Sequence, residues 1–211
     1  MTKEEFIKEL EKINIVLTEI QLKKLDKFYN LLIEWNEKIN LTRITEKKDV
    51  YLKHFYDSLT ITKVVDLEKE KTLCDVGTGA GFPGIVLKIA YPNLKITLID
   101  SLQKRVNYLN EIIKELDLKD IKAIHTRGED YKEKFDVVTA RAVANIEKLL
   151  KYTMHLVKKE GKFIAMKGNI EEELTKSVEN KINKKYKVEK IEKFTLPKEE
   201  SLRSLVVIKN K

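Results

Sequence analysis

Apolar positions in the first seventy residues recur at the spacing of helices. Thr18 and Gln21 have the spacing of a capping box, so a helix is predicted to begin there. The apolar residues after it form one helical face: Leu22, Leu25, Phe28, Tyr29, Leu32 and Trp35. A shorter stripe precedes it (Phe6, Ile7, Leu10 and Ile13), and a third helix is predicted over about 46–65, with Val50, Phe55 and Leu59 inward. We interpret these stripes as core packing, and residues 1–70 as a helical cap.

From Lys71 onward, short apolar strands alternate with helices. The predicted strands cover 72–76, 95–100, 121–126, 135–140, 161–167, 186–194 and 204–209, and the predicted helices cover 81–91, 102–117, 145–158 and 170–184. The first five strands are continuous apolar runs, which indicates a parallel sheet covered on both faces. The last two are joined by a loop and predict an antiparallel hairpin. Residues 71–211 therefore predict an α/β domain with a mostly parallel seven-stranded sheet, forming one compact unit with the cap.

Length and composition narrow the class of protein. The 211 residues can bury a sizeable core, and no stretch approaches the roughly 20 apolar residues of a membrane span. The N-terminus, MTKEEFIKEL, lacks the apolar region of a signal peptide. One cysteine, Cys74, excludes an internal disulfide, and three dispersed histidines predict no metal site. We expect a cytoplasmic protein that does not bind a membrane.

The net charge of +8 is unevenly distributed. Residues 1–70 carry a net charge of −1, whereas residues 71–211 carry +9. With 37 lysines in the chain, part of this excess can reflect a general preference for lysine on solvated faces. Its location nevertheless favours an anionic partner such as a nucleic acid for the second part of the chain.

A glycine-rich turn, CDVGTGAGFPG, follows the first predicted strand at 74–84 and indicates a nucleotide site. In the dinucleotide fingerprint G-x-G-x-x-G the third glycine would be residue 82, which is Phe. The spacing found is D-x-G-x-G-x-G, from Asp75 through Gly77 and Gly79 to Gly81, and it resembles motif I of S-adenosylmethionine-dependent methyltransferases. Asp75 suits a positively charged amino group, and the glycines let the backbone approach the ligand. Cys74 lies within the strand, and we interpret it as inert core.

The next two strands supply polar groups for an adenosine ligand. Asp100 ends the second strand, where a carboxylate can accept hydrogen bonds from both ribose hydroxyls. Because nicotinamide enzymes use the same acid, Asp100 does not discriminate between cofactors; Ser101 beside it is assigned to the same site. The third strand leads into Gly128, Glu129 and Asp130, where a carboxylate could bond the adenine edge.

The absence of two motifs limits which atom can accept the methyl group. The stretch TARAVAN (139–145) stands where enzymes that methylate exocyclic amines carry N/D-P-P-Y/F, and no cysteine is placed for attack on cytosine C5. An acceptor that is already nucleophilic fits better. Guanine N7 has an in-plane lone pair and no proton to remove, so positioning can supply most of the catalysis.

Eight segments carry a more specific resemblance across nearly the whole chain. They are WNEKINLT (35–42), KHFYDSL (53–59), DVGTGAGFPG (75–84), LIDSLQKRVNYL (98–109), TRGED (126–130), ARAVA (140–144), MKG (166–168) and LRSLVVIK (202–209). Together they resemble the RsmG family, formerly glucose-inhibited division protein B. The resemblance implies a Rossmann-like class I methyltransferase fold with S-adenosylmethionine as donor. It further implies methylation of N7 of a guanine in 16S ribosomal RNA near the decoding region, with that RNA or the small ribosomal subunit as partner. We expect a monomer.

Residue by residue, the resemblance assigns two sets of side chains. To the cofactor site it assigns Gly77, Phe82, Gly128, Glu129 and Arg141. Around the guanine and the RNA backbone it places Arg127, Arg141, Lys167 and Arg203. Relatives often carry a side chain where this protein has Gly128, which matters little if the backbone makes the contact.

The five arginines stand out against 37 lysines. A planar guanidinium suits bidentate contacts with guanine or phosphate, and Arg127, Arg141 and Arg203 lie at or near strand ends. The alternative is a structural ion pair for each arginine and a solvated position for Lys167. His54 and Asp57, three residues apart, are expected to hydrogen-bond locally and fix the cap, because N7 methylation needs no base.

Three other functions share parts of this pattern. A nicotinamide oxidoreductase would have the same fold, although Phe82 breaks its fingerprint. A small-molecule methyltransferase would share the cofactor site without using the basic half. A non-catalytic RNA-binding protein would use that half without methyl transfer.

Overall fold

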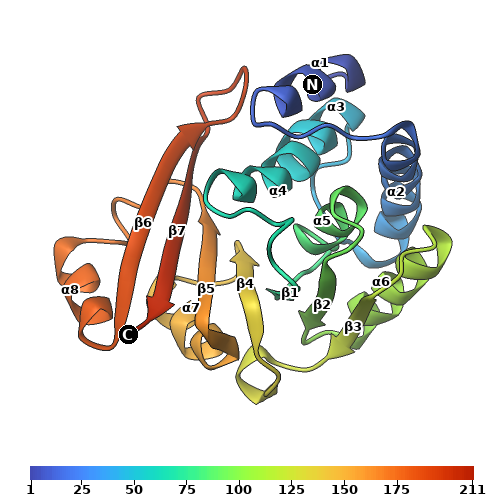
Figure 1. Cartoon of the computed structure of the whole chain (residues 1–211). Coiled ribbons are helices and arrows are strands. Elements are labelled where there is room, and N and C mark those ends of the chain that lie inside the picture. Colours follow the sequence, from blue (N-terminus) through green and yellow to red (C-terminus); the bar gives the residue numbers. More distant parts are fainter.

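The computed structural model describes residues 1–211, and its centre is a seven-stranded sheet in the order β3-β2-β1-β4-β5-β7-β6 (Figure 1). The strands are β1 (Thr72–Val76), β2 (Lys95–Asp100), β3 (Ile121–His125), β4 (Phe135–Arg141), β5 (Val157–Lys167), β6 (Tyr186–Thr195) and β7 (Leu202–Asn210). The first five are parallel, and β7 pairs antiparallel with both β5 and β6. The predicted fold class, including the C-terminal hairpin, is confirmed.

Alternate residues of the central strands point into two separate cores. Leu73, Leu98 and Val137 belong to the larger apolar cluster, whereas their chain neighbours Cys74 and Val138 belong to the smaller one. Both faces are therefore covered, as the continuous apolar runs predicted. Cys74 is fully buried, and burial raises the pKa of its thiol, which agrees with the expected inert role.

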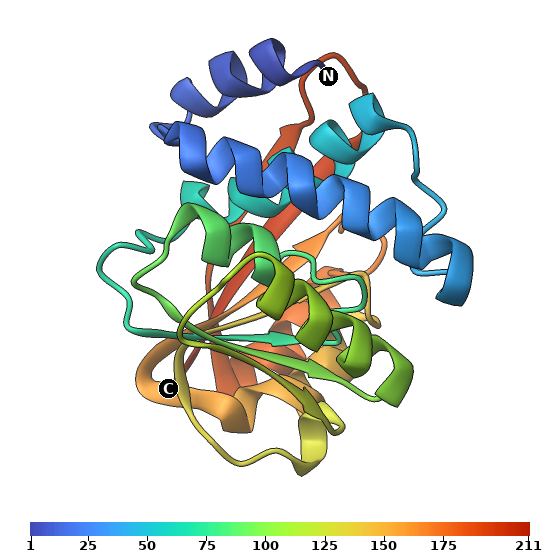
Figure 2. The same ribbon diagram turned by 90° about the vertical axis from the view of Figure 1, so that its right-hand side faces the viewer.

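Helices form the outer layers (Figures 1 and 2). On one face lie α5 (Gly84–Ala90) and α6 (Gln103–Glu115), and on the other lie α7 (Ile146–Thr153), the 3-10 turn η4 (Met154–Leu156) and α8 (Lys176–Lys185). A further 3-10 turn, η3 (Gly128–Asp130), follows β3. None of the helices combines the length and apolar character needed to cross a membrane.

The N-terminal helices pack outside α5 and α6 (Figure 2). They are α1 (Lys3–Glu11), α2 (Glu19–Ile39), α3 (Lys47–Val50), the π-helical segment η1 (Tyr51–Tyr56), α4 (Asp57–Leu59) and the 3-10 turn η2 (Thr60–Lys63). The capping box at Thr18 and Gln21 is confirmed in both directions, and α1 has a second one at Thr2 and Glu5. The predicted third helix is one continuous helical run with a π segment inside it, and Val50, Phe55 and Leu59 are buried as expected.

Several predicted boundaries are wrong for local reasons. The helix after β1 begins at Gly84 and not at 81, because Gly81 has a positive φ, which is incompatible with a right-handed helix. The helix predicted over 170–184 begins at Lys176, where the Thr175 side chain accepts the hydrogen bond of the Val178 N–H. Strand β5 starts at Val157, four residues earlier than predicted, where Val157 pairs with Phe135 before a bulge.

Candidate active site

The glycine-rich turn follows β1, beside the point between β1 and β4 where the strand order of the sheet reverses. In a doubly wound sheet the carboxyl ends of the strands form a ligand crevice at this point. Gly77 has φ +71° and donates its N–H to Ile99 O at 2.8 Å, which anchors the turn to β2. A Cβ added to Gly79 would meet nothing closer than Gly77 O at 4.0 Å, so the turn leaves open space at that residue.

Asp75 lies at the base of the turn and is completely buried. Its Oδ2 accepts hydrogen bonds from Thr78 Oγ1 at 2.7 Å and from Gly84 N at 2.9 Å, while Oδ1 has no partner. Burial raises the pKa of Asp75 to about 6 against the lowering effect of these bonds. A buried acceptor without a donor fits the positively charged amino group expected of the cofactor.

Asp100 holds the glycine turn against β2. Its Oδ2 accepts from Gly79 N at 2.9 Å and pairs with Arg105 Nη1 at 3.4 Å, while Oδ1 accepts from Leu102 N at 2.9 Å. A carboxylate offers about four acceptor positions, so capacity remains for a ribose hydroxyl. Ser101 beside it is exposed.

Residues after β3 form a turn beside the end of β1. Gly128 is buried, and a Cβ there would lie 2.8 Å from Val76 Cγ1 and 2.9 Å from Tyr152 O, so the turn approaches β1 and α7 too closely for a side chain. Arg127 and Glu129 are exposed. Phe82, in contrast, has its ring in the core, so a contact between Phe82 and a cofactor would come from its backbone.

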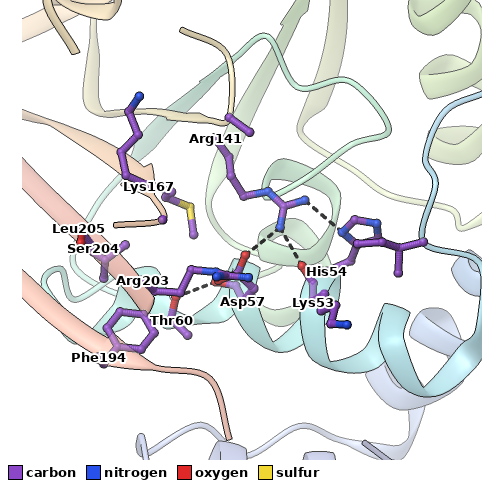
Figure 3. A pocket seen from close by; sticks show the side chains of 14 residues that line it. Lys53, His54, Asp57, Thr60, Arg141, Lys167, Phe194, Arg203, Ser204 and Leu205 are labelled. Carbon is purple, nitrogen blue, oxygen red and sulfur yellow. Dashed lines mark hydrogen bonds and ion pairs between the residues drawn. The ribbon is translucent and has the colours of Figure 1, made fainter. Parts of the chain in front are cut away.

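A cavity of about 340 Å³ lies at the carboxyl ends of β4 and β5, and we name it the arginine cavity (Figure 3). Its lining residues are Ile44, Lys53, His54, Asp57, Thr60, Arg141, Ala142, Met166, Lys167, Gly168, Phe194, Arg203, Ser204 and Leu205. The sheet register explains the gathering: Arg141 pairs with Met166, and Lys167 pairs with Ser204, the residue after Arg203. Three of the four predicted acceptor residues therefore meet here, while Arg127 does not line the cavity.

Asp57 joins two arginines from distant strands (Figure 3). Its Oδ2 accepts from Arg141 Nη1 at 3.0 Å, and its Oδ1 accepts from Arg203 Nε at 3.0 Å. Arg141 Nη1 also donates to Lys53 O at 3.1 Å, and Arg203 Nη1 donates to Leu202 O at 3.0 Å. Both guanidinium groups are thus fixed in the wall of the cavity.

His54, one helical turn before Asp57, also contacts Arg141. Arg141 Nη2 lies 3.2 Å from His54 Nδ1, and the imidazole stacks on the Phe82 ring at a centroid distance of 4.3 Å. Burial, followed by the positive charge of Arg141, lowers the pKa of His54 to about 3. The expected local bond between His54 and Asp57 is not formed; both side chains bind Arg141 instead.

Lys167 is largely buried, so the alternative that it is a solvated surface lysine is wrong. Only 10% of its side chain is exposed, and its Nζ pairs with Glu173 Oε1 at 2.9 Å and donates to Ala144 O. Glu173 also accepts the Ile146 N–H at the start of α7. These bonds fasten residues 142–145, which place the Val143 side chain over Gly77.

The sheet order, the C-terminal hairpin and the glycine turn are those of the Rossmann-like class I methyltransferase fold. Solved structures share this fold: precorrin-6y C5,15-methyltransferase from Geobacter metallireducens has a TM-score of 0.57 at 16% identity, covering 82% of this chain and 92% of that one. A SAM-dependent methyltransferase from Aquifex aeolicus has a TM-score of 0.57 at 19% identity, covering 77% and 93%.

Sequence comparison identifies the family. The family model described as rRNA small subunit methyltransferase G matches residues 21–203. Ribosomal RNA small subunit methyltransferase G of Bacillus licheniformis is 46% identical over 216 residues, covering 99% of this chain and 90% of the relative. The enzyme of the same name from Bacillus subtilis is 45% identical over 216 residues, with the same coverage of 99% and 90%. The chain belongs to the rRNA small subunit methyltransferase G family, which confirms the resemblance seen in its motifs.

Proposed function

We propose that this chain transfers a methyl group from S-adenosylmethionine to N7 of a guanine in 16S ribosomal RNA near the decoding region. One observation carries the proposal: the arginine cavity lies at the same edge of the sheet as the glycine turn, and Val143 connects the two across Gly77. Membership of a family of small-subunit ribosomal RNA methyltransferases supports the substrate class.

The residues of the turn fit S-adenosylmethionine. The orphaned Oδ1 of Asp75 would accept from the amino group, and the turn Gly77–Gly81 would bring backbone against the ligand. Asp100 and Ser101 would bind the ribose hydroxyls, while Gly128 and Glu129 would lie at the adenine, with Phe82 contributing backbone. When bound, S-adenosylmethionine supplies an electrophilic sulfonium methyl group.

The cavity residues would position the acceptor guanine. The three hydrogen bonds of Arg141 use three of its five N–H donors, so two remain for a ligand. Those donors can bind guanine O6 or a phosphate, and Lys167 and Arg203 would bind the base or the backbone beside it. No general base is needed at N7, which agrees with the engagement of Asp57 by two arginines.

The charge distribution supports an RNA partner. The net charge of +9 on residues 71–211 would attract phosphates, with Arg127 outside the cavity as one exposed contact. We propose residues 1–70 as a cap that supplies Lys53, His54 and Asp57 to the cavity wall. We further propose that the enzyme acts in the cytoplasm as a monomer, without a membrane partner.

Methyl-labelled S-adenosylmethionine tests this function directly. The purified chain should label intact small ribosomal subunits or deproteinised 16S RNA, and borohydride–aniline cleavage should locate the label at N7 of one guanine. A small-molecule methyltransferase would leave both RNAs unlabelled. NADH binding in a fluorescence titration would favour an oxidoreductase, and RNA binding without label would favour a non-catalytic role.

A further inference from the structure

His54 is a buried histidine that N7 methyl transfer does not require as a base. It lies on η1 and is 8% exposed. Its Nδ1 is 3.2 Å from Arg141 Nη2, its Nε2 is 3.0 Å from Thr42 Oγ1, and its ring stacks on Phe82. Both nitrogens and one face of the ring are thus in contact with other groups.

These contacts determine the protonation state and the tautomer. A guanidinium group has only donors, so Nδ1 must be the acceptor in its bond with Arg141. Nε2 then carries the proton and donates to Thr42 Oγ1, which also accepts the Ile44 N–H at 3.0 Å. An imidazolium would direct an N–H against the Arg141 N–H, so the geometry requires a neutral ring.

The bond from His54 adds a second fixed point to the Arg141 guanidinium. Lys53 O and Asp57 Oδ2 both bind Nη1, and a plane held at one nitrogen alone can still swing about it. The bond to Nη2 stops that rotation and leaves two N–H donors in a defined orientation. The cation also lies over the Phe82 ring, with Cζ 5.3 Å from the ring centroid.

Charge explains why a neutral acceptor suits this place. Arg141 and Arg203 share the single carboxylate of Asp57, so this group of three carries a net charge of +1. Guanine gains positive charge when N7 is methylated, and a protonated His54 would add a second charge nearby. A carboxylate at residue 54 would instead compete with Asp57 for Arg141 and change the charge of the cavity.

We propose that His54 is a positioning residue: its neutral imidazole fixes the Arg141 guanidinium and thereby orients the acceptor guanine. This role rests on the proposed function for its catalytic consequence, whereas the arrangement of the imidazole itself can be measured separately. The charged groups that line the cavity with the ring are Arg141 on β4, Lys167 on β5, Arg203 on β7, and Lys53 and Asp57 on the helical run of His54 itself.

Kinetics of single and double variants test the catalytic part. His54→Phe keeps a ring on Phe82 and removes the acceptor, whereas His54→Asn keeps an acceptor oxygen. We expect His54→Phe to lower kcat on small subunits by about ten- to a hundredfold, with S-adenosylmethionine affinity nearly unchanged, and His54→Asn to recover part of it. His155→Phe, far from the cavity, is the matched control and should behave as wild type.

A double-mutant cycle distinguishes positioning from simple packing. If His54 acts through Arg141, adding His54→Phe to Arg141→Ala should cause no further loss of kcat. Additive losses, or a wild-type kcat for His54→Phe, would overturn the proposal. Equal losses of melting temperature and cofactor affinity in His54→Phe and His54→Asn would do the same, because they would indicate a structural role.

Nitrogen-15 NMR of the imidazole gives a readout that does not depend on activity. We expect the neutral Nε2–H tautomer from pH 5 to 8 in the wild type, and titration at higher pH in Arg141→Ala, which removes the neighbouring cation. A wild-type His54 that titrates near pH 6.5 would overturn the proposal. An enzyme that labels no RNA but retains this tautomer would instead contradict the proposed function.

Discussion

Asp57 determines the geometry of the cavity with one carboxylate, since Arg141 and Arg203 come from strands more than sixty residues apart in sequence and both bind it. Removing one arginine leaves the other paired, whereas removing Asp57 would leave two partly buried cations without their counter-ion. Loss of one partner from a fully buried ion pair costs about 3–5 kcal/mol, and solvent at the two arginines would reduce this cost. The carboxylate therefore has a structural as well as an electrostatic role.

Replacing Arg203 should affect the acceptor and spare the donor. Arg203→Ala removes a charge-assisted contact worth about 1.5–3 kcal/mol, so we expect kcat/KM for the RNA substrate to fall about ten- to a hundredfold. Arg203→Lys keeps the charge without the planar fork and should recover only part of the activity. Calorimetry should show nearly unchanged S-adenosylmethionine affinity, and parallel losses of affinity and methylation would place Arg203 in the cofactor site.

The buried carboxyl of Asp75 makes cofactor affinity depend on pH. Its pKa of about 6 in the folded protein exceeds the ordinary value of 3.8, so its contribution to stability is complete below 3.8 and is lost as the pH rises through about 6. A cationic amino group beside Oδ1 favours the ionised carboxylate. We therefore expect S-adenosylmethionine affinity to rise about tenfold between pH 5 and pH 7. Asp75→Asn should flatten this profile, and an unchanged slope would separate Asp75 from the amino group.

Among the glycines of the chain, Gly84 leaves the least room for a side chain. A Cβ at Gly84, the first residue of α5, would lie 2.2 Å from Leu98 Cδ2 and 3.0 Å from Asp75 Oδ2. Leu98 is completely buried, so its side chain could move away only by displacing other core side chains. The helix therefore approaches β2 as closely as it does because residue 84 has no side chain.

Gly84→Ala should accordingly destabilise the fold. We expect the free energy of unfolding to fall by about 1–3 kcal/mol, the range for overpacking a core. Gly168→Ala is a suitable control because its Cβ would meet nothing closer than Leu202 O at 3.9 Å, and it should change stability by less than about 0.5 kcal/mol. Chemical denaturation measures both; equal effects of the two substitutions would contradict the steric explanation.

Strands were more predictable than helix starts. A buried parallel strand is a local apolar run, so β1 and β2 have the bounds predicted from sequence. The predicted start of α5 was wrong because it was placed at Gly81, whose positive φ the sequence does not specify. The π segment within 46–65 is likewise invisible in apolar spacing, since it changes the helix by a fraction of a turn.

The sequence likewise predicted some residues of the site but not the contacts between them. Arg141, Lys167 and Arg203 were predicted together because motifs and strand ends identify them, and the register brings them to one cavity. The sequence also marked His54 and Asp57 as a pair on one helix, but not their common partner. Arg141 is 87 residues from His54 and 84 from Asp57 in sequence, and only the packing of the cap on the sheet brings it there.

The cap and the sheet share one apolar core. The larger cluster contains Phe6 and Phe28 from the cap together with Ile85 and Tyr108 from beyond residue 70. Phe28 contacts Phe55 with ring centroids 5.7 Å apart and Phe82 at 5.4 Å, so it connects α2 directly to the glycine turn. Residues 1–70 therefore contribute core as well as cavity wall.

This shared core predicts a single cooperative unfolding transition. Phe28→Ala should lower the free energy of unfolding by about 3–5 kcal/mol, the usual cost of removing a buried aromatic ring. Far-ultraviolet dichroism, which follows helices, and fluorescence of Trp35 on α2 should shift to the same lower denaturant midpoint. A lower midpoint for Trp35, which reports the cap, than for the dichroism signal of the whole molecule would show that the cap unfolds by itself.

Under the proposed function, Val143 would couple binding of the cofactor to binding of the RNA, because it lies between the glycine turn and the arginine cavity. The Val143 side chain packs against Gly77 so closely that a Cβ added to Gly77 would lie 2.7 Å from Val143 Cγ2. The next residue, Ala144, accepts a hydrogen bond from Lys167 in the cavity wall. A ligand that shifts residues 142–145 from either side changes the surface that the other ligand meets. Linkage then requires reciprocity: whatever factor the bound cofactor applies to RNA affinity, bound RNA applies to cofactor affinity.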